Sequence, residues 1–186
     1  ATSADTVYVS NLNGYTITPS NEVQWVSARR TTSYNAGVHG GNLVMKFIPT
    51  NDVSAIGGTV QITPSVNLFV ADGTTACTVT AKVGNTEGNV KGVGSSIVTS
   101  GALTIAMRST LVRTQEVTVT CSNNLAVNVL GSVTFSIVTS SDPALVSGQP
   151  GYTITTAPVV TWGGASRSGS LFSGQSGGHL KIRFTP

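Results

Sequence analysis

Apolar and polar residues alternate along most of this chain in short stretches. In Val117–Cys121 valine and cysteine occupy every second position and threonine the others, and Val23–Ser27 alternates around Trp25. A period of two places one side of an extended strand against a core and the other toward water. No long window shows the 3.6-residue period of an amphipathic helix. The pattern therefore predicts an all-β protein.

Turn sequences rich in Gly, Pro, Asn and Asp separate the expected strands, whose centres lie roughly 8–12 residues apart, as in antiparallel β-sandwiches. The expected strands are Thr6–Ser10, Gly14–Pro19, Val23–Ser27, Leu43–Ile48, Thr59–Thr63, Asn67–Val70, Cys77–Val83, Ser96–Thr99, Leu103–Arg108, Glu116–Cys121, Leu125–Val129 and Val133–Thr139.

Composition supports this fold class and excludes several function classes. The 186 residues include 27 Thr and 25 Val, which are β-branched and suit strands. Only 9% of residues are charged, so the chain does not resemble a disordered polyelectrolyte. The net charge of +3 comes from scattered residues and forms no basic stripe, which argues against nucleic acid as a partner. No apolar run approaches the ~20 residues of a membrane helix, so membrane insertion is not expected.

An internal repeat is the most informative feature of the sequence. Residues 1–49 align without a gap with residues 138–186 at a constant offset of 137, with 21 identities in 49 positions. Gly14–Thr18 recurs whole as Gly151–Thr155, and Thr2-Ser3-Ala4-Asp5 meets Thr139-Ser140-Ser141-Asp142. Self-similarity at a fixed period is typical of tandem arrays.

The repeat suggests three segments: copy 1 at 1–49, a cysteine-containing segment at 50–137, and copy 2 at 138–186. Either the chain is part of a longer array with a period of 137 residues, which we favour, or two related end modules flank a different centre. A segment of 49 residues has little core of its own. We therefore expect it to pair with residues 50–137 or with their counterpart in a neighbouring module, and strand exchange between modules is a hypothesis.

Cys77 and Cys121 are the two cysteines, and both share parity with apolar neighbours, so both are expected to point inward and form one disulfide. A disulfide favours an extracellular or cell-surface location. The pattern resembles the inter-sheet bridge of immunoglobulin-like domains, which implies an Ig-like sandwich. No Trp lies between the cysteines and no Tyr precedes Cys121 by two residues, so the resemblance covers the architecture only.

A wider resemblance covers most of the period. It rests on the Leu-x-x-x-Phe-x-Pro strand within Gly41–Pro49, the Cys-Thr-Val-Thr and Val-Thr-Cys-Ser-Asn strands, and the Val-Thr-Phe-Ser-x-x-Thr-Ser-x-Asp ending. These phrases resemble repeat units of large secreted surface proteins of microbial eukaryotes and of microbial adhesins. The resemblance implies stalks, coats or filaments outside the cell, with neighbouring repeats as partners and self-assembly as a further possibility.

Catalytic, metal and cofactor signatures are missing from the sequence. The seven acidic residues are dispersed, the histidines His39 and His179 sit beside glycine, and no Gly-x-Ser-x-Gly motif occurs. Two cysteines and two distant histidines do not make a zinc pattern. We therefore expect a non-catalytic protein without metal or cofactor, and an enzyme ranks third among the function classes.

Two further sets of residues are retained in both copies. Tyr15, Trp25, Tyr152 and Trp162 are either core anchors, which we favour, or an aromatic platform for glycans. Arg30 and Arg167 either contact a neighbouring module or are exposed loop charges.

The favoured function is a structural repeat of an extracellular stalk, coat or filament protein. The alternative is a carbohydrate-binding or adhesion module that uses exposed aromatic residues. The repeated Thr-x-Thr pairs could also form an ice-binding face, but they are more typical of the wet side of a sheet.

Overall fold

The all-β prediction is confirmed. The computed structural model describes residues 21–37, 41–69, 73–83, 86–122, 130–157, 159–168 and 179–185, and within these ranges all helices are absent and all named strands pair antiparallel. No helix in this described part is long and apolar enough to cross a membrane. The strands are β1 (Gln24–Arg30), β2 (Asn42–Ile48), β3 (Thr59–Pro64), β4 (Gly73–Thr74), β5 (Ala76–Val83), β6 (Thr86–Lys91), β7 (Val93–Thr99), β8 (Ala102–Met107), β9 (Val117–Ser122), β10 (Gly131–Thr139), β11 (Val146–Ile154), β12 (Thr161–Arg167) and β13 (Leu180–Thr185).

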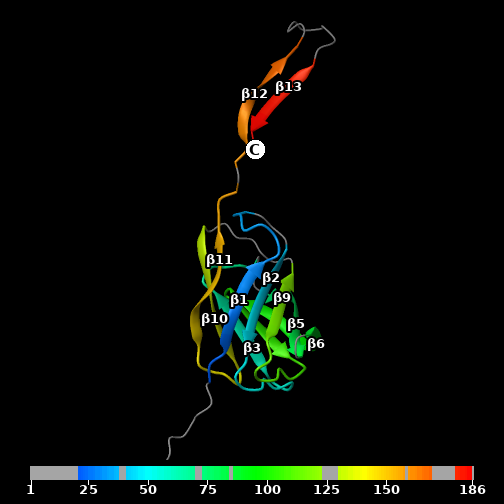
Figure 1. The fold of residues 1–186 in the computed structure, drawn as a ribbon, viewed down its shortest axis with the longest axis vertical. Helices are drawn as coiled ribbons and strands as arrows, with labels where there is room; N and C mark the ends of the chain where they lie inside the picture. The colour runs from blue at the N-terminus through cyan, green and yellow to red at the C-terminus, as the bar shows by residue number, and fades with distance from the viewer. Residues whose placement is uncertain are drawn as a thin grey trace, which may run out of the picture.

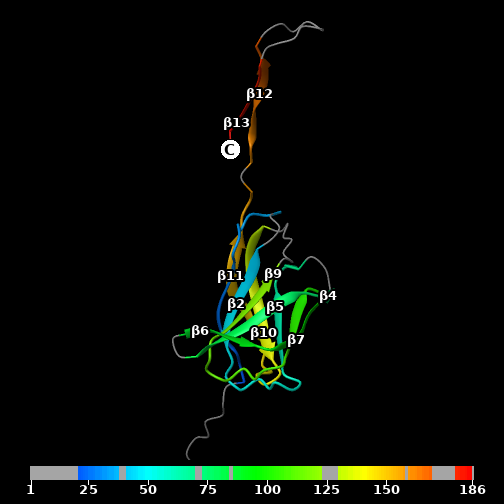
Figure 2. The same ribbon diagram turned by 90° about the vertical axis from the view of Figure 1, so that its right-hand side faces the viewer.

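Two of the three sheets form what we call the body. The first sheet has the order β1-β2-β9-β5-β6, and the second has the order β11-β10-β3-β8-β7-β4. The third sheet is the two-stranded hairpin β12–β13, which lies beyond the body in two perpendicular views (Figures 1 and 2).

Both sheets of the body contribute to one hydrophobic core. The alternation seen in the sequence places every second residue of β8, β9 and β10 inside. Phe47, Val117 and Val119 of the first sheet and Ile105 and Phe135 of the second are almost fully buried in the same cluster. Burial of these side chains is the main driving force for holding the sheets together.

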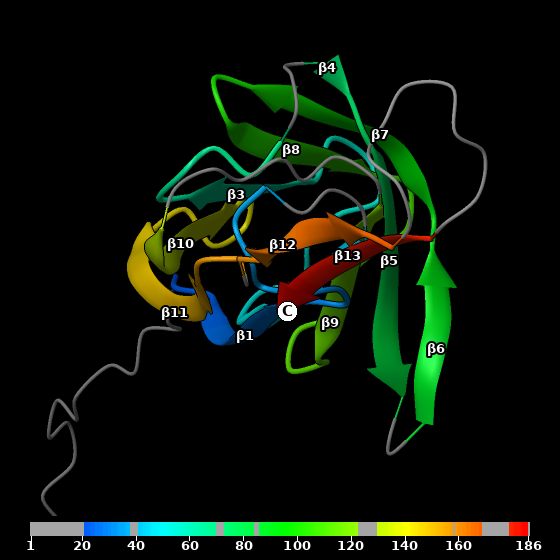
Figure 3. The ribbon, with the colours of Figure 1, turned by 90° about the horizontal axis from the view of Figure 1, so that it is seen from above.

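The body closes differently at its two sides. On one side the edge strands β1 and β11 run side by side, joined by parallel bridges between Glu22 and Ala144 and between Asn35 and Thr155. On the other side the chain passes from β4 in the second sheet to β5 in the first through the buried Thr75. In the view from above, β10 and β11 lie at one side of the body and β5 and β6 at the other (Figure 3).

The expected strand at Asn67–Val70 is wrong for residues 67–69, which lie in a loop. Leu68 and Phe69 are buried in the core, because an apolar loop can fill a core without joining a sheet. The expected strands Thr6–Ser10, Gly14–Pro19 and Leu125–Val129 fall outside the described residues. The strands β4, β6, β11, β12 and β13 were not expected.

Candidate functional site

Residues 138–155, which belong to the second copy of the repeat, pack against the first copy and the cysteine-containing segment. The body therefore uses residues from all three segments of the sequence. Because these contacts join the two copies, we take the junction and the nearby hairpin as the candidate functional site.

Asp142 is the polar centre of the junction. It is 0% exposed, and its two carboxylate oxygens accept hydrogen bonds from the neighbouring Thr139 and from two adjacent residues about 90 positions earlier in the sequence. Thr50 donates from its Oγ1 at 2.7 Å and from its backbone N at 3.2 Å, and Asn51 donates from Nδ2 at 2.7 Å. Thr139 donates from Oγ1 at 3.3 Å and accepts the Asp142 N–H at 2.9 Å. We call this set of four residues the Asp142 clasp.

The strand β11 follows the clasp and covers one side of the core. It pairs with β10 through two register shifts. At Gly151 any side chain would meet the ring of Phe135 and would lie 2.6 Å from the carbonyl oxygen of Val133. Glycine at this position therefore allows β11 to pass close to β10.

Tyr152 carries the junction into the core. It is nearly buried, and its ring lies 5.3 Å from that of Tyr34 and 6.4 Å from that of Phe135. Burial raises the pKa of Tyr152 to about 12, although the nearby positive charge of Arg30 acts in the opposite direction. Its hydroxyl has no hydrogen-bond partner among the described residues.

Trp25 joins the first copy to the second. Its ring is half-buried, stacks on Phe135 at 5.3 Å, and donates a hydrogen bond from Nε1 to the carbonyl oxygen of Pro150 at 3.0 Å. At the far end of the junction, Ala36 N donates to the carbonyl oxygen of Thr155, whose own N donates to the carbonyl oxygen of Tyr34. The junction thus reaches from Trp25 in β1 to Ala36 in the segment that follows.

The hairpin β12–β13 repeats the hairpin β1–β2 pair for pair. Trp25 lies opposite Phe47 and Trp162 opposite Phe184; Arg30 lies opposite Leu43 and Arg167 opposite Leu180. Both hairpins also shift register at the same place, after the tryptophan. Each partner in one hairpin is 137 positions from its equivalent in the other, so over these two hairpins the sequence repeat is also a repeat of structure.

The two hairpins differ in their surroundings. Leu43, Met45 and Phe47 of β2 are 0% exposed. Their equivalents in β13, which are Leu180, Ile182 and Phe184, are 70%, 50% and 63% exposed, and Trp162 of β12 is 64% exposed. The hairpin therefore presents an apolar face to solvent.

A charged cluster lies on the outer side of the first sheet. Glu116 accepts a hydrogen bond from Lys46 Nζ at 3.0 Å, and Lys82 Nζ lies 3.4 Å from the same oxygen. The hydrogen bond from Lys46 lowers the pKa of Glu116. Arg183 occupies the position equivalent to Lys46 in the exposed hairpin.

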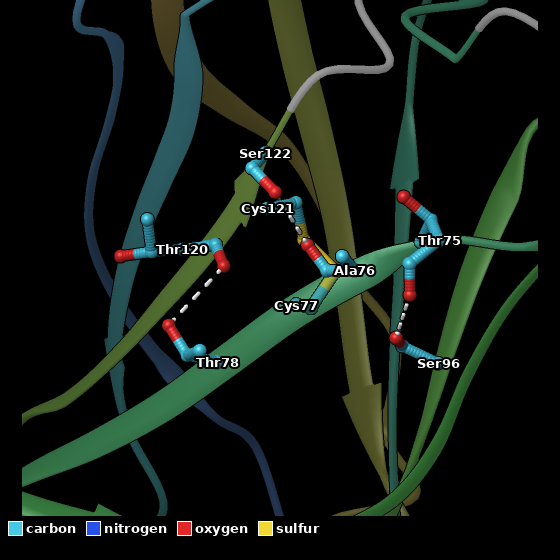
Figure 4. Close-up of a disulfide and its surroundings, with 8 residues drawn as sticks. All are labelled: Thr75, Ala76, Cys77, Thr78, Ser96, Thr120, Cys121 and Ser122. Atoms are coloured by element: carbon cyan, nitrogen blue, oxygen red, sulfur yellow. Dashed lines mark hydrogen bonds between the residues drawn. A yellow bond between two sulfur atoms is a disulfide. The ribbon is translucent and has the colours of Figure 1, made fainter.

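The expected disulfide between Cys77 and Cys121 is present, and both side chains contribute to the core as expected. The expectation of an inter-sheet bridge is wrong. Cys77 of β5 and Cys121 of β9 are directly opposite each other in adjacent strands of the first sheet, with their Cα atoms 4.0 Å apart (Figure 4). Opposed residues of an antiparallel pair come close enough for a disulfide, so parity alone could not distinguish the two arrangements. The disulfide is compatible with an extracellular location.

Hydrogen bonds on both sides of the disulfide support it. Ser122 Oγ donates to the carbonyl oxygen of Ala76 at 3.4 Å, and Thr78 Oγ1 lies 3.5 Å from that of Thr120 (Figure 4). Ser96 Oγ donates to the carbonyl oxygen of Thr75, where β4 continues into β5.

The structure separates the residues suggested by sequence. Of the aromatic candidates, Trp25 and Tyr152 lie in the junction, Trp162 lies on the exposed hairpin, and Tyr15 falls outside the described residues. Arg30 is 3% exposed and lies near Tyr152, whereas Arg167 pairs through its backbone with Leu180.

The described residues contain no group of three or more His, Cys, Asp or Glu side chains that could hold a metal ion. An open hollow of about 230 Å³ lies where β10 meets β11 and is lined by residues such as Ser132, Thr134 and Pro150. None of the described residues that line this hollow is acidic or a histidine.

Sequence reasoning missed the roles of Asp142 and Gly151. The signal was present, because both residues belong to phrases that recur in the two copies, Thr-Ser-x-Asp and Gly-Tyr-Thr-Ile-Thr. In the second copy, the burial of the Asp142 carboxylate and the close approach of β11 to β10 at Gly151 explain why these two residues are needed.

No protein-family model, curated protein or solved structure matches this chain. A functional conclusion therefore depends on the junction, the exposed hairpin and the disulfide described above.

Proposed function

We propose that this chain is a structural, non-catalytic repeat module of a long protein at the cell surface or outside the cell. In this proposal the body is an Ig-like β-sandwich, and copies of it follow one another with a period of 137 residues to form a stalk, coat or filament.

One observation carries the proposal: the hairpin β12–β13 reproduces β1–β2 in sequence, register and bulge position, but stands apart from the body. A second start of the same fold in one chain is typical of tandem arrays. The disulfide supports an oxidising environment. The low share of charged residues is compatible with extensive contacts between modules.

The proposal is tested on the native protein from its source. Denaturing gels after reduction give its mass, and tryptic peptide mapping identifies the repeats. We expect a species several times heavier than 19 kDa, with peptides from further related periods, that surface biotinylation labels on intact cells. A native protein without further periods, or one that is labelled only after lysis, would contradict the proposal.

The exposed pair Trp162 and Phe184 supports a second candidate, binding to a glycan, because exposed aromatic rings can stack on sugars. Titration with soluble chitin and glucan oligomers tests it through tryptophan fluorescence. Glycan binding predicts quenching that disappears in Trp162→Ala. The half-buried Trp25 serves as an internal reference, since its packing on Phe135 leaves one ring face covered. No quenching at millimolar oligomer would exclude this candidate for the sugars tested.

A further inference from the structure

The covered hairpin β1–β2 shows what the exposed hairpin lacks. The edge of β2 that does not face β1 pairs with β9, from the pair Asn42–Ser122 to the pair Phe47–Val117. Its inner face packs on the core, in which Phe135 and Val119 are nearly fully buried. All of these covering residues come from residues 50–157, which follow the hairpin in sequence.

The exposed hairpin has the features needed for the same cover. Leu180, Ile182 and Phe184 preserve the apolar face of Leu43, Met45 and Phe47. Arg183 preserves the positive charge of Lys46, which binds Glu116 of the covering segment at 3.0 Å. An unpaired strand edge with an apolar face is a ready template for another strand.

We infer that the apolar face of β12–β13 docks a second stretch equivalent to residues 50–157, which completes a second body around this hairpin. The occupant is the disulfide-bearing part of another module of the same kind, and it follows the hairpin in the same order as in the body described above. The strand equivalent to β9 pairs with β13. Leu180 then lies opposite the equivalent of Cys121, and Phe184 opposite the equivalent of Val117, as in the pairing of β2 with β9. The inference rests on the proposed function only in requiring that a second module exists.

The folding unit then differs from the sequence repeat. Residues 138–157 complete the body that precedes them, whereas residues 159–185 begin the next one. Neighbouring bodies are then joined by a short connection after β11, and neither can be cut at the repeat boundary without losing strands.

The test uses the chain of 186 residues extended at its end by a second copy of residues 50–157. The added copy begins with Thr50 directly after Pro186, because Pro186 is the equivalent of Pro49, which Thr50 follows in the first copy. Hydrogen exchange is measured on peptides from β13 and, as an internal reference, from β2. We expect exchange in β13 to slow by at least about 100-fold in the extended chain compared with the original chain, because its amides gain strand partners and a core. Thiol titration should show two disulfides.

Matched variants of the extended chain locate the contact. Ile182→Asp places a charge on the apolar face and should abolish the protection of β13 while β2 stays protected. Ser166→Asp places the same side chain on the partner strand β12, at the position equivalent to the exposed Arg29 of the body, and should preserve the protection.

Three results would overturn the inference. The first is an added segment that forms its disulfide while β13 exchanges as fast as in the original chain. The second is an added segment that stays unfolded with free thiols, since the hairpin would then have failed to supply the strands that residues 21–49 supply. The third is concentration-dependent protection of β13 in the original chain, with a dimer in light scattering, which would make a second whole copy the occupant. None of these results depends on the mass of the native protein, so the proposed function is tested separately.

Discussion

The Asp142 clasp gives the sharpest prediction about the body. Replacing Asp142 by alanine removes the acceptor for hydrogen bonds from Thr50, Asn51 and Thr139, two of them at 2.7 Å, and leaves these donors at a buried site. A hydrogen bond to a carboxylate contributes roughly 1.5–3 kcal/mol, and each buried donor left without an acceptor costs about 1–3 kcal/mol. We therefore expect Asp142→Ala to lower the free energy of unfolding by about 3–5 kcal/mol, a large part of the stability of a typical domain.

Asp142→Asn tests whether acceptor capacity is what matters. The amide keeps the shape of the carboxylate but replaces one acceptor oxygen with a donor, which must face a donor of Thr50 or Asn51 in either orientation. We expect a loss of about 2–3 kcal/mol from the donor left unsatisfied. Asp52→Ala is the matched control, because this exposed aspartate accepts one hydrogen bond, from Arg113 N at 2.7 Å, and should cost about 1 kcal/mol or less.

The assay is urea unfolding followed by the fluorescence of Trp25, whose stacking on Phe135 is lost when the body unfolds, with circular dichroism as a second probe. Trp162 is already largely exposed and should contribute little to the signal change. A double-mutant cycle with Thr50→Val should give a coupling of at least about 1 kcal/mol with Asp142. Stability within 1 kcal/mol of the Asp52→Ala control for both Asp142 variants, or a zero coupling, would refute the reasoning.

Three further predictions concern the disulfide, the close approach of β11 to β10 at Gly151, and the buried Tyr152. Replacing Cys77 and Cys121 together by alanine opens a loop of 44 residues and should cost about 4 kcal/mol in urea unfolding; a loss below 1 kcal/mol would mean that the unfolded chain is already compact there. Gly151→Ala should lower the free energy of unfolding by about 1–3 kcal/mol, because the added methyl group meets Phe135. The control Ser147→Ala, at an exposed position, should be nearly neutral. Equal melting temperatures of the two variants would contradict the close approach of β11 to β10 at Gly151. The pKa of Tyr152 rises from 10 in the unfolded chain to about 12 in the folded one, so its contribution to the free energy of unfolding is complete below pH 10 and is lost between pH 10 and 12. Over this range the free energy of unfolding of the wild type should fall by about 2 kcal/mol more than that of Tyr152→Phe. Parallel pH profiles of the two proteins would rule the effect out.

Strong local patterns predicted the centre of the fold well. The alternation in Val117–Cys121 and Leu103–Arg108 led directly to β9 and β8, because a half-buried strand has to alternate. The strand β11 was missed because Gly148, Pro150 and Gly151 are typical of turns. It is held as a strand by β10 beside it and by Trp25 across from it, which are contacts that no local pattern contains.

The candidate site was predictable only in part. The repeat pointed to the right part of the chain, since Asp142, Gly151, Tyr152 and Trp162 all lie in the second copy, but it did not single out Asp142 or Gly151. It could not show that one copy is buried and the other exposed, because that depends on whether a covering segment folds against the hairpin. The disulfide partners followed from the presence of two cysteines, but their sheet positions depended on long-range strand order.

The course of the chain through the body has a mechanical consequence. The strand β1 begins at one end of the body and β11 ends at the opposite end, and the two run side by side in the same direction (Figure 1). Tension applied to the chain before β1 and after β11 would therefore slide these strands along each other, and the contacts between them would have to break together rather than one by one. The disulfide would then withhold the 44-residue loop, roughly 150 Å of extended chain, from any stretching that followed. Such a body resists pulling, and when it yields it lengthens by about a third less than it would without the disulfide.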